Sequence, residues 1–200
     1  SRGTLGNPGK YSVKMSLLDK GSISELVPEV YFNVLALDNT VMPAKNREEK
    51  VNFQRKVAVL QGEIGEYSNK LSEMKNKMPY ILNAIKKTEK SADFLLNNYN
   101  SINKSIKEIE MLFFGDSVKG KLDIQSLPTP STRIGLIGYY QRNSTADPTI
   151  THQNSFEIAK EEFMPIKSMI EDLKVMLEKL EDTLKENKAP YTPGRLEFNN

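Results

Sequence analysis

The sequence predicts a mainly α protein: an antiparallel helical bundle of three to four helices, two of them long, that follows a short β-hairpin. Apolar residues recur every third or fourth position in three stretches after residue 45, whereas they alternate with polar residues near the N-terminus. Hydrophobic residues make up 38% of the 200 residues and charged residues 27%, a composition typical of amphipathic helices. We expect two parts, a hairpin over residues 1–40 and a bundle over residues 41–200.

Residues 1–40 carry the hairpin signals. Residues 7–10 and 20–22 have turn chemistry, residues 11–17 alternate apolar and polar side chains, and residues 30–37 are rich in β-branched and aromatic side chains. Two strands alone are at best marginally stable. The hairpin therefore either packs on the helices or is the remnant of a β-sandwich whose other strands lie upstream.

Helical periodicity begins near Lys45. Three apolar stripes follow: Phe53, Val57, Leu60, Ile64, Tyr67, Leu71, Met74 and Met78; Leu95, Tyr99, Ile102, Ile106, Ile109 and Phe113; and Phe156, Ala159, Phe163, Ile166, Ile170, Leu173, Leu177, Leu180 and Leu184. From these stripes we expect Leu60, Ile64, Ile106, Ile109, Leu173 and Leu177 to share one core.

The first break in the bundle has two candidate positions. Pro79 removes a backbone donor, but residues 88–93 offer Ser91 as a cap and Asp93 for a first turn. We favour the second position, with Pro79 as a kink and Pro165 as a similar kink in the last helix.

The second half of the predicted bundle has clear signals for where its helices start and end. Gly115-Asp116 ends the second helix, and residues 115–130 read as a long loop. Ser131 can cap a short helix that runs to Gln141, residues 143–151 form another loop, and the last helix spans about residues 154–188. We expect the tail over residues 189–195 to be ordered without being helical, with Tyr191 inserted between helices and Arg195 near a carboxylate.

Two Gly-x-x-Gly pairs interrupt the helices, Gly62 with Gly65 and Gly135 with Gly138. A glycine inside a helix costs about 1 kcal/mol against alanine. The pairs are either flexible hinges or places where two helix backbones approach closely. We favour close approach, with the third helix crossing the first at the glycines.

Catalytic, cofactor-binding and metal-binding sites are not expected. His152 is the only histidine, and its combination with Asp147, Glu157 and Glu161 matches no common ligand spacing. Paired acids such as Glu108 with Glu110, or Glu161 with Glu162, fall on charged helix faces that read as solvated surface. No nucleophile elbow or phosphate-binding loop is present in the sequence.

The net charge and the length of the apolar runs limit the classes of partner that the chain can bind. The net charge is +2 and acids alternate with the lysines, so we expect no nucleic-acid partner. The apolar runs are too short for a membrane span. Cysteine is absent, which rules out disulfides and thiol chemistry. A start at Ser1-Arg2-Gly3 suggests a piece of a longer chain.

Several runs together resemble a known type of protein. They are Pro8-Gly9-Lys10-Tyr11, Gly115-Asp116, Ser144-Thr145-Ala146-Asp147-Pro148-Thr149, Phe156-Glu157-Ile158-Ala159, Glu161-Glu162-Phe163 and Ala189-Pro190-Tyr191-Thr192-Pro193-Gly194-Arg195. In this order they resemble the C-terminal region of large secreted proteins of Bacteroidetes-type bacteria, which carry BNR-repeat, sortilin-like β-propellers and are often labelled glycosyl hydrolases. The resemblance spans essentially the whole chain.

The resemblance implies a β-propeller upstream, then an immunoglobulin-like segment to which the hairpin belongs, then this helical end. It implies a secreted, periplasmic or cell-surface location, and it places any hydrolase activity outside this chain. We therefore expect a non-catalytic accessory or interaction module that caps or spaces the propeller or supports a homo-oligomer. The alternative is a carbohydrate- or protein-binding module, with Tyr139, Tyr140, Tyr191 and Arg195 as its interaction surface.

Overall fold

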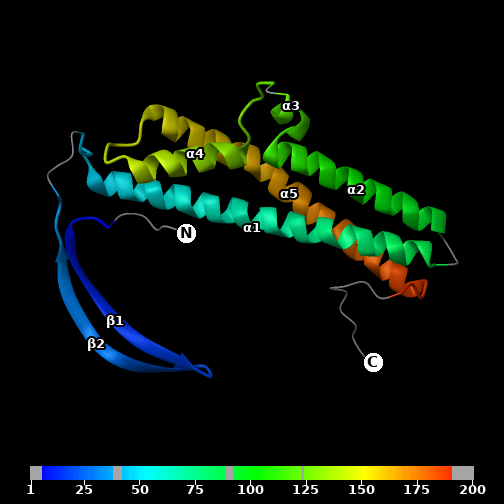
Figure 1. Ribbon diagram of the computed structural model, residues 1–200, viewed down its shortest axis with the longest axis horizontal. Helices are drawn as coiled ribbons and strands as arrows, with labels where there is room; N and C mark the ends of the chain where they lie inside the picture. Colours follow the sequence, from blue (N-terminus) through cyan, green and yellow to red (C-terminus); the bar gives the residue numbers. More distant parts are fainter. Residues whose placement is uncertain (1–5, 38–41, 89–91, 123, 191–200) are drawn as a thin grey trace. The chain divides into compact units, whose positions relative to one another are not determined.

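The computed structural model describes residues 6–37, 42–88, 92–122 and 124–190. A two-stranded antiparallel hairpin comes first and helices follow, so the prediction of a mainly helical chain with an N-terminal hairpin is confirmed (Figure 1). The chain divides into two compact units. The first comprises Ser1–Lys56 and Tyr139–Thr149, and the second comprises Val57–Gly138 and Ile150–Asn200.

The hairpin is longer than the sequence pattern indicates. Strand β1 spans Gly9–Asp19 and β2 spans Ser22–Val34, joined at Lys20 and Gly21, which both have positive φ. The predicted turn at residues 20–22 is confirmed, but β2 begins eight residues before the predicted start at residue 30. Register shifts on either side of Met15 explain the error, because a bulge breaks the two-residue alternation that marks a strand.

Helix α1 spans Arg47–Lys86 and continues through Pro79. Its first turn is capped by Asn46, whose Oδ1 accepts the backbone N–H of Glu49 at 3.1 Å. The helix ends at Lys86 and the next one begins at Ala92, so the preferred break near residues 88–93 is confirmed over the break at Pro79. The proposed cap Ser91 lies outside the described residues.

Helix α2 spans Ala92–Phe114 and ends at Gly115, which has φ +84°. The expected loop over residues 115–130 is wrong in part, because it contains α3, Ser117–Lys121, capped by the carboxylate of Asp116. Helix α4 spans Pro130–Asn143. Ser131 is therefore inside the helix, since Pro130 suits a first helical position and Thr129 accepts the N–H of Thr132 at 3.3 Å.

Helix α5 spans Ile150–Glu186, starting four residues before the predicted boundary. It ends in a Schellman motif. The N–H of Lys188 donates to the Lys185 carbonyl at 3.0 Å, the N–H of Ala189 donates to the Leu184 carbonyl at 2.9 Å, and Lys188 has φ +54°. The tail residues Tyr191 and Arg195 lie outside the described residues.

The core of the second unit is built from the predicted apolar stripes. All six residues expected in one core are buried: Leu60, Ile64, Ile106, Ile109, Leu173 and Leu177. The ring of Phe163 in α5 makes edge contacts with Tyr67 of α1 and with Phe113 of α2, at centroid distances of 5.7 and 6.1 Å. Helices α1, α2 and α5 therefore meet around one aromatic cluster.

Contacts between the helices also fix their directions within this unit. Glu63 of α1 pairs with Lys167 of α5, and Lys77 pairs with Glu181, so residue numbers rise together and α1 runs parallel to α5. Lys75 pairs with Glu110 of α2, whereas Tyr67 and Phe113 meet through Phe163, so α2 runs antiparallel to α1. The helices are thus not antiparallel throughout.

The predicted glycine crossing is wrong. A Cβ added at Gly62, Gly65 or Gly135 would meet no atom within 4 Å, so no backbone approaches closely there. Gly138 alone is near another helix, and its added Cβ would lie 3.2 Å from the Gln61 side-chain oxygen. Gly62 and Gly65 instead occupy exposed positions of α1, where their spacing has no packing purpose.

Candidate functional site

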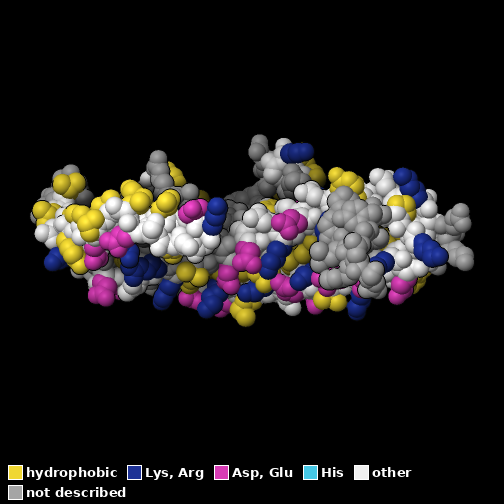
Figure 2. All heavy atoms as spheres, turned by 90° about the horizontal axis from the view of Figure 1, so that it is seen from below, with side chains coloured by type: hydrophobic (Ala, Val, Ile, Leu, Met, Phe, Trp, Pro, Cys, Tyr) yellow, Lys and Arg dark blue, Asp and Glu magenta, His cyan; other side chains and the backbone are white. Residues whose placement is uncertain are grey.

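The hairpin carries an apolar face. Three directly opposed pairs form it: Tyr11 with Phe32, Val13 with Val30, and Met15 with Val27. The Tyr11 and Phe32 rings stack at a centroid distance of 6.0 Å. Every side chain of this face is at least 38% exposed. Hydrophobic side chains accordingly gather on the surface of the hairpin (Figure 2).

The opposite face of the hairpin is polar over most of its length and ends in the exposed apolar pair of Leu18 with Ile23. Lys10 pairs with Asn33 and Ser12 with Tyr31, and the Lys10 ammonium lies 4.9 Å from the Tyr31 ring centroid. The Tyr31 hydroxyl donates to Glu29 at 2.8 Å. Hydrogen bonds from Ser12 and then Tyr31 lower the pKa of the Glu29 carboxyl. One apolar and one polar face is the pattern of an antiparallel sheet that packs on one side only.

A second polar arrangement ties the loop before α5 to the start of α1. The Asp147 carboxylate accepts the backbone N–H of Lys45 at 3.0 Å and that of Asn46 at 3.5 Å. The buried Lys50 ammonium donates to the Ser144 carbonyl. Burial lowers the pKa of Lys50, and the charge of Asp147 opposes that shift. Asp147 thus stabilises a helix start, a role that complements the partial positive charge there.

A cavity of about 340 Å³ lies beside this cluster, lined in part by Arg47, Lys50 and Gln54. The buried Gln54 amide donates to the Gln141 carbonyl at 2.7 Å, and its Oε1 has no hydrogen-bond partner among the described residues. These groups serve chiefly to join two chain segments about 90 residues apart in sequence.

The structure does not bring together the residues that were considered as metal ligands. His152 lies half-buried in the first turn of α5, while Glu157 and Glu161 are exposed further along that helix. Within the described parts of the chain, no three His, Cys, Asp or Glu side chains are grouped closely enough to hold a metal ion.

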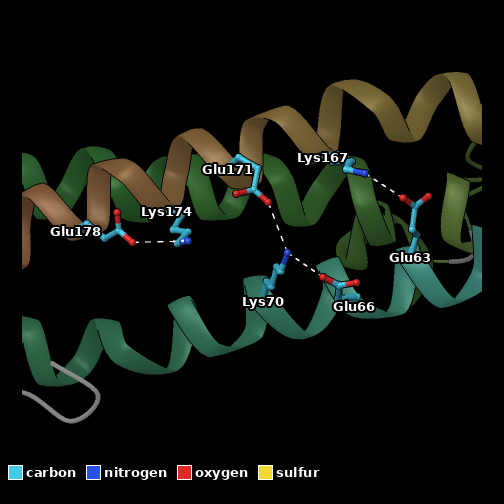
Figure 3. A network of polar contacts seen from close by, with 7 residues as sticks. All are labelled: Glu63, Glu66, Lys70, Lys167, Glu171, Lys174 and Glu178. Carbon is cyan, nitrogen blue, oxygen red and sulfur yellow. Dashed lines mark hydrogen bonds and ion pairs between the residues drawn. The ribbon is translucent and has the colours of Figure 1, made fainter. Parts of the chain in front are cut away.

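Helices α1 and α5 are joined by a ladder of ion pairs (Figure 3). Lys167 contacts Glu63 at 3.0 Å, and Lys70 bridges Glu66 at 2.9 Å and Glu171 at 3.6 Å. Exposed ion pairs contribute about 0.2–1 kcal/mol each. The ladder therefore favours the register between the helices more than it stabilises the fold.

Tyr67 lies at the centre of the ladder. Its ring centroid is 4.2 Å from the Lys70 ammonium and 5.2 Å from that of Lys167. The Tyr67 hydroxyl donates a hydrogen bond to Glu171 and lowers the pKa of that carboxyl, with the charges of Lys70 and Lys174 acting in the same direction. The same contact raises the pKa of the Tyr67 hydroxyl.

A pocket of about 220 Å³ opens in the groove between α1 and α5. Met74, Ile170 and Leu177 form its floor, and four glutamates and three lysines form its rim. Three of those glutamates pair with the three lysines, in the pairs Lys70 with Glu171, Lys77 with Glu181, and Lys174 with Glu178. The remaining acid is Glu73.

The predicted aromatic surface is described only in part. Tyr139 and Tyr140 of α4 are 58% and 51% exposed, with ring centroids 5.6 Å apart in an edge-on arrangement. Both rings therefore lie on the surface of α4. Tyr191 and Arg195, the other two residues of the predicted surface, lie outside the described residues.

Sequence patterns missed the polar cluster around Asp147 and Lys50. Its contacts join residues about 100 positions apart, a separation that no local periodicity encodes. The only local signal was a lysine on the otherwise apolar side of the first turns of α1. The hairpin face, by contrast, follows from the alternation over residues 11–17.

Among the described residues, no helix is both long and apolar enough to cross a membrane. Comparisons with known proteins found no matching family model, no matching curated protein and no matching solved structure.

Proposed function

We propose that this chain is a non-catalytic accessory module of a larger secreted protein, in which the hairpin binds another β-sheet and the helical bundle acts as a spacer or cap. The resemblance found in the sequence suggests the C-terminal end of a β-propeller protein, with the hairpin completing an immunoglobulin-like segment. The bundle would then be the helical end of that protein.

The exposed apolar face of the hairpin is the observation that carries this proposal. Six apolar side chains in three cross-strand pairs are exposed on one face of a ribbon whose other face is mostly polar. Exposed contiguous apolar surface marks interaction sites, and a lone two-stranded sheet is marginal in water. Packing against a second sheet would cover this face and supply the missing stability.

The ion-pair ladder supports a spacer role for the bundle. Some of its ion pairs cross between the two helices, as Glu63 with Lys167 and Glu171 with Lys70 do. Paired charges on a long helical stripe hold two helices in register.

A matched pair of charge substitutions tests the proposed partner. Val30→Lys places a charge on the apolar face, and Asn33→Lys places the same charge on the polar face of the same strand. The probe is the β segment encoded immediately before this chain, produced separately and titrated with each variant. We expect Val30→Lys to weaken binding more than tenfold, because the buried lysine would be desolvated, and Asn33→Lys to leave it within about twofold.

Equal effects of the two substitutions, or no binding by the unsubstituted chain, would rule out the hairpin as the docking element. Analytical sedimentation of the isolated chain measures its oligomeric state and tests a further outcome. A dimer that Val30→Lys dissociates would mean that the apolar face joins two copies of this chain instead.

A second candidate function is carbohydrate or protein binding, favoured by the exposed Tyr139 and Tyr140 pair. Exposed rings offer flat surfaces for stacking on sugars or apolar side chains. Titration with soluble oligosaccharides tests this function in two variants, Tyr139→Ala and the control Tyr80→Ala on α1. A loss of oligosaccharide binding in Tyr139→Ala alone would support it. Saturable binding unaffected by Tyr139→Ala would exclude this site.

A further inference from the structure

We propose that the partner of the hairpin adds a third strand along the free edge of β1, and that this strand alternates acidic with apolar side chains. This assignment rests on the proposed function, because it requires that the hairpin bind another β-sheet. What it adds is the edge at which the two sheets join and the chemistry of the joining strand.

The two free edges of the hairpin differ in regularity. Across the register shift between Val13 and Met15, β2 carries one residue more than β1. The shift between Met15 and Ser16 likewise leaves one extra residue on β2. Both irregularities therefore lie on β2, whereas β1 is regular over its 11 residues.

The free edge of β2 is a poor template for another strand. The extra residue of a bulge is unpaired and bends its strand, so the backbone groups of β2 do not form one even row. Pro28, which has no backbone N–H, lies within the first of the two shifts. Bulges and prolines are features that protect an edge strand from pairing.

The free edge of β1 has neither feature. In an antiparallel pair, every second residue directs its N–H and C=O groups away from the neighbouring strand. Because β1 is regular and contains no proline, these groups form a continuous row of donors and acceptors. A strand that joins the hairpin therefore finds its hydrogen-bonding partners on β1.

A third strand also changes the stability of the sheet. Two strands are marginal in water, whereas three strands with a hydrophobic face are stable on their own. At 11 residues, β1 is longer than a typical strand of about five to six residues, so its edge accommodates a whole strand. Alternate side chains of that strand would continue the apolar face of Tyr11, Val13 and Met15.

Charge is divided unequally between the two strands. Away from the turn, the charged residues of β1 are Lys10 and Lys14, whereas those of β2 are glutamates. The lysines are four residues apart, so both lie on the polar face of β1. Neither lysine forms an ion pair among the described residues. A strand beside β1 therefore meets two ammonium groups that have no carboxylate.

These lysines select among possible strands. Opposite charges side by side on neighbouring strands are favourable, and like charges are unfavourable. Pairing with β1 of a second copy would bring the same lysines against Lys10 and Lys14, so the edge disfavours self-association. The complementary strand has carboxylates on its polar face and apolar side chains on the other face.

Nuclear Overhauser contacts in the complex test which edge is used. The isotope-labelled full chain is mixed with the unlabelled β segment encoded immediately before it. We expect contacts from backbone protons of that segment to alternate residues of β1 and none to the backbone of β2. Backbone contacts to β2, or contacts only to side chains of the apolar face, would overturn the edge assignment and leave the docking of the hairpin intact. Failure of the unsubstituted chain to bind would overturn the proposed function as well.

Two charge reversals test the chemistry of the added strand. Lys14→Glu lies on β1, and the control Lys56→Glu replaces an exposed lysine of α1. In titrations with the same segment at low salt, we expect Lys14→Glu to weaken binding about fivefold, because it turns an attraction into a repulsion. We expect Lys56→Glu to leave the affinity within about twofold and Lys14→Gln to fall between the two reversals.

High salt should reduce the difference between the reversals, because exposed charges are screened. Equal affinities of Lys14→Glu and Lys56→Glu at low salt, or tighter binding by Lys14→Glu, would contradict an acidic strand.

Discussion

Gly62 and Gly65 are positions where α1 faces solvent, and neither has an atom within 4 Å of its added Cβ. The sequence could identify them as costly helix residues but could not show which face they occupy. Spacing of three residues is equally compatible with a helix crossing and with bare solvent-exposed surface. At the residue scale, the Cβ environment decides between these interpretations.

Gly62→Ala and Gly65→Ala should each raise the free energy of unfolding by about 0.5–1 kcal/mol, because alanine restricts the unfolded chain and meets no clash in the helix. Gly138→Ala is the matched control, since its Cβ lies 3.2 Å from the Gln61 side chain and should offset part of the gain. Urea melts measure all three. A loss of stability at Gly62 or Gly65 would mean that these positions approach another backbone.

Glu171 offers a test of the ion-pair ladder by pH. Its pKa is lowered by the Tyr67 hydroxyl and by neighbouring lysines, so its stabilising contribution is fully present above its ordinary pKa of 4.5 and is lost as pH falls through the lowered value. Tyr67→Phe should raise the pKa of Glu171 toward its ordinary value and make the acid loss of stability smaller.

Carboxyl NMR titration from neutral pH to about pH 3 measures the pKa, and urea melts over the same range measure stability. Tyr80→Phe, an exposed tyrosine of the same helix, should change neither quantity. An unchanged pKa of Glu171 in Tyr67→Phe would show that the lysines alone depress it.

At the scale of secondary-structure elements, the sequence predicted the long helices best. Apolar stripes located α1, α2 and α5, because burial of one helix face imposes a period of 3.6 residues that is visible locally. Their boundaries were less accurate where caps come from distant residues. Asp147 contacts the backbone just before α1 from about 100 residues away, and α3 depends on the single cap at Asp116.

Leu173→Ala and Leu60→Ala should each lower the free energy of unfolding by about 2–5 kcal/mol, since both side chains are buried in the core and leave cavities. Val175→Ala is the control on α5, where the side chain is 47% exposed and the cost should stay within about 0.5 kcal/mol. Chemical denaturation gives the three values. Similar small losses at all three positions would contradict the assigned core.

At the scale of the whole molecule, the alternating pattern of residues 11–17 led to the apolar face of the hairpin, while the bulge beside Met15 hid the full length of β2. The groove between α1 and α5 could not be foreseen, because it depends on the parallel direction of two helices that are separated by more than sixty residues. Local sequence patterns therefore identified the apolar face of the hairpin, whereas the pocket between α1 and α5 depends on tertiary structure that no local pattern shows.

The central claim is that the hairpin is completed by a second β-sheet outside this chain. Amide hydrogen exchange over β1 and β2 tests it most directly, measured in the isolated chain and in a longer product that includes the preceding β segment. We expect fast exchange in the isolated hairpin, because a two-stranded sheet is marginal, and much slower exchange in the longer protein, with the core amides of α2 unchanged. Hairpin amides protected as strongly in the isolated chain as those of α2 would contradict the claim.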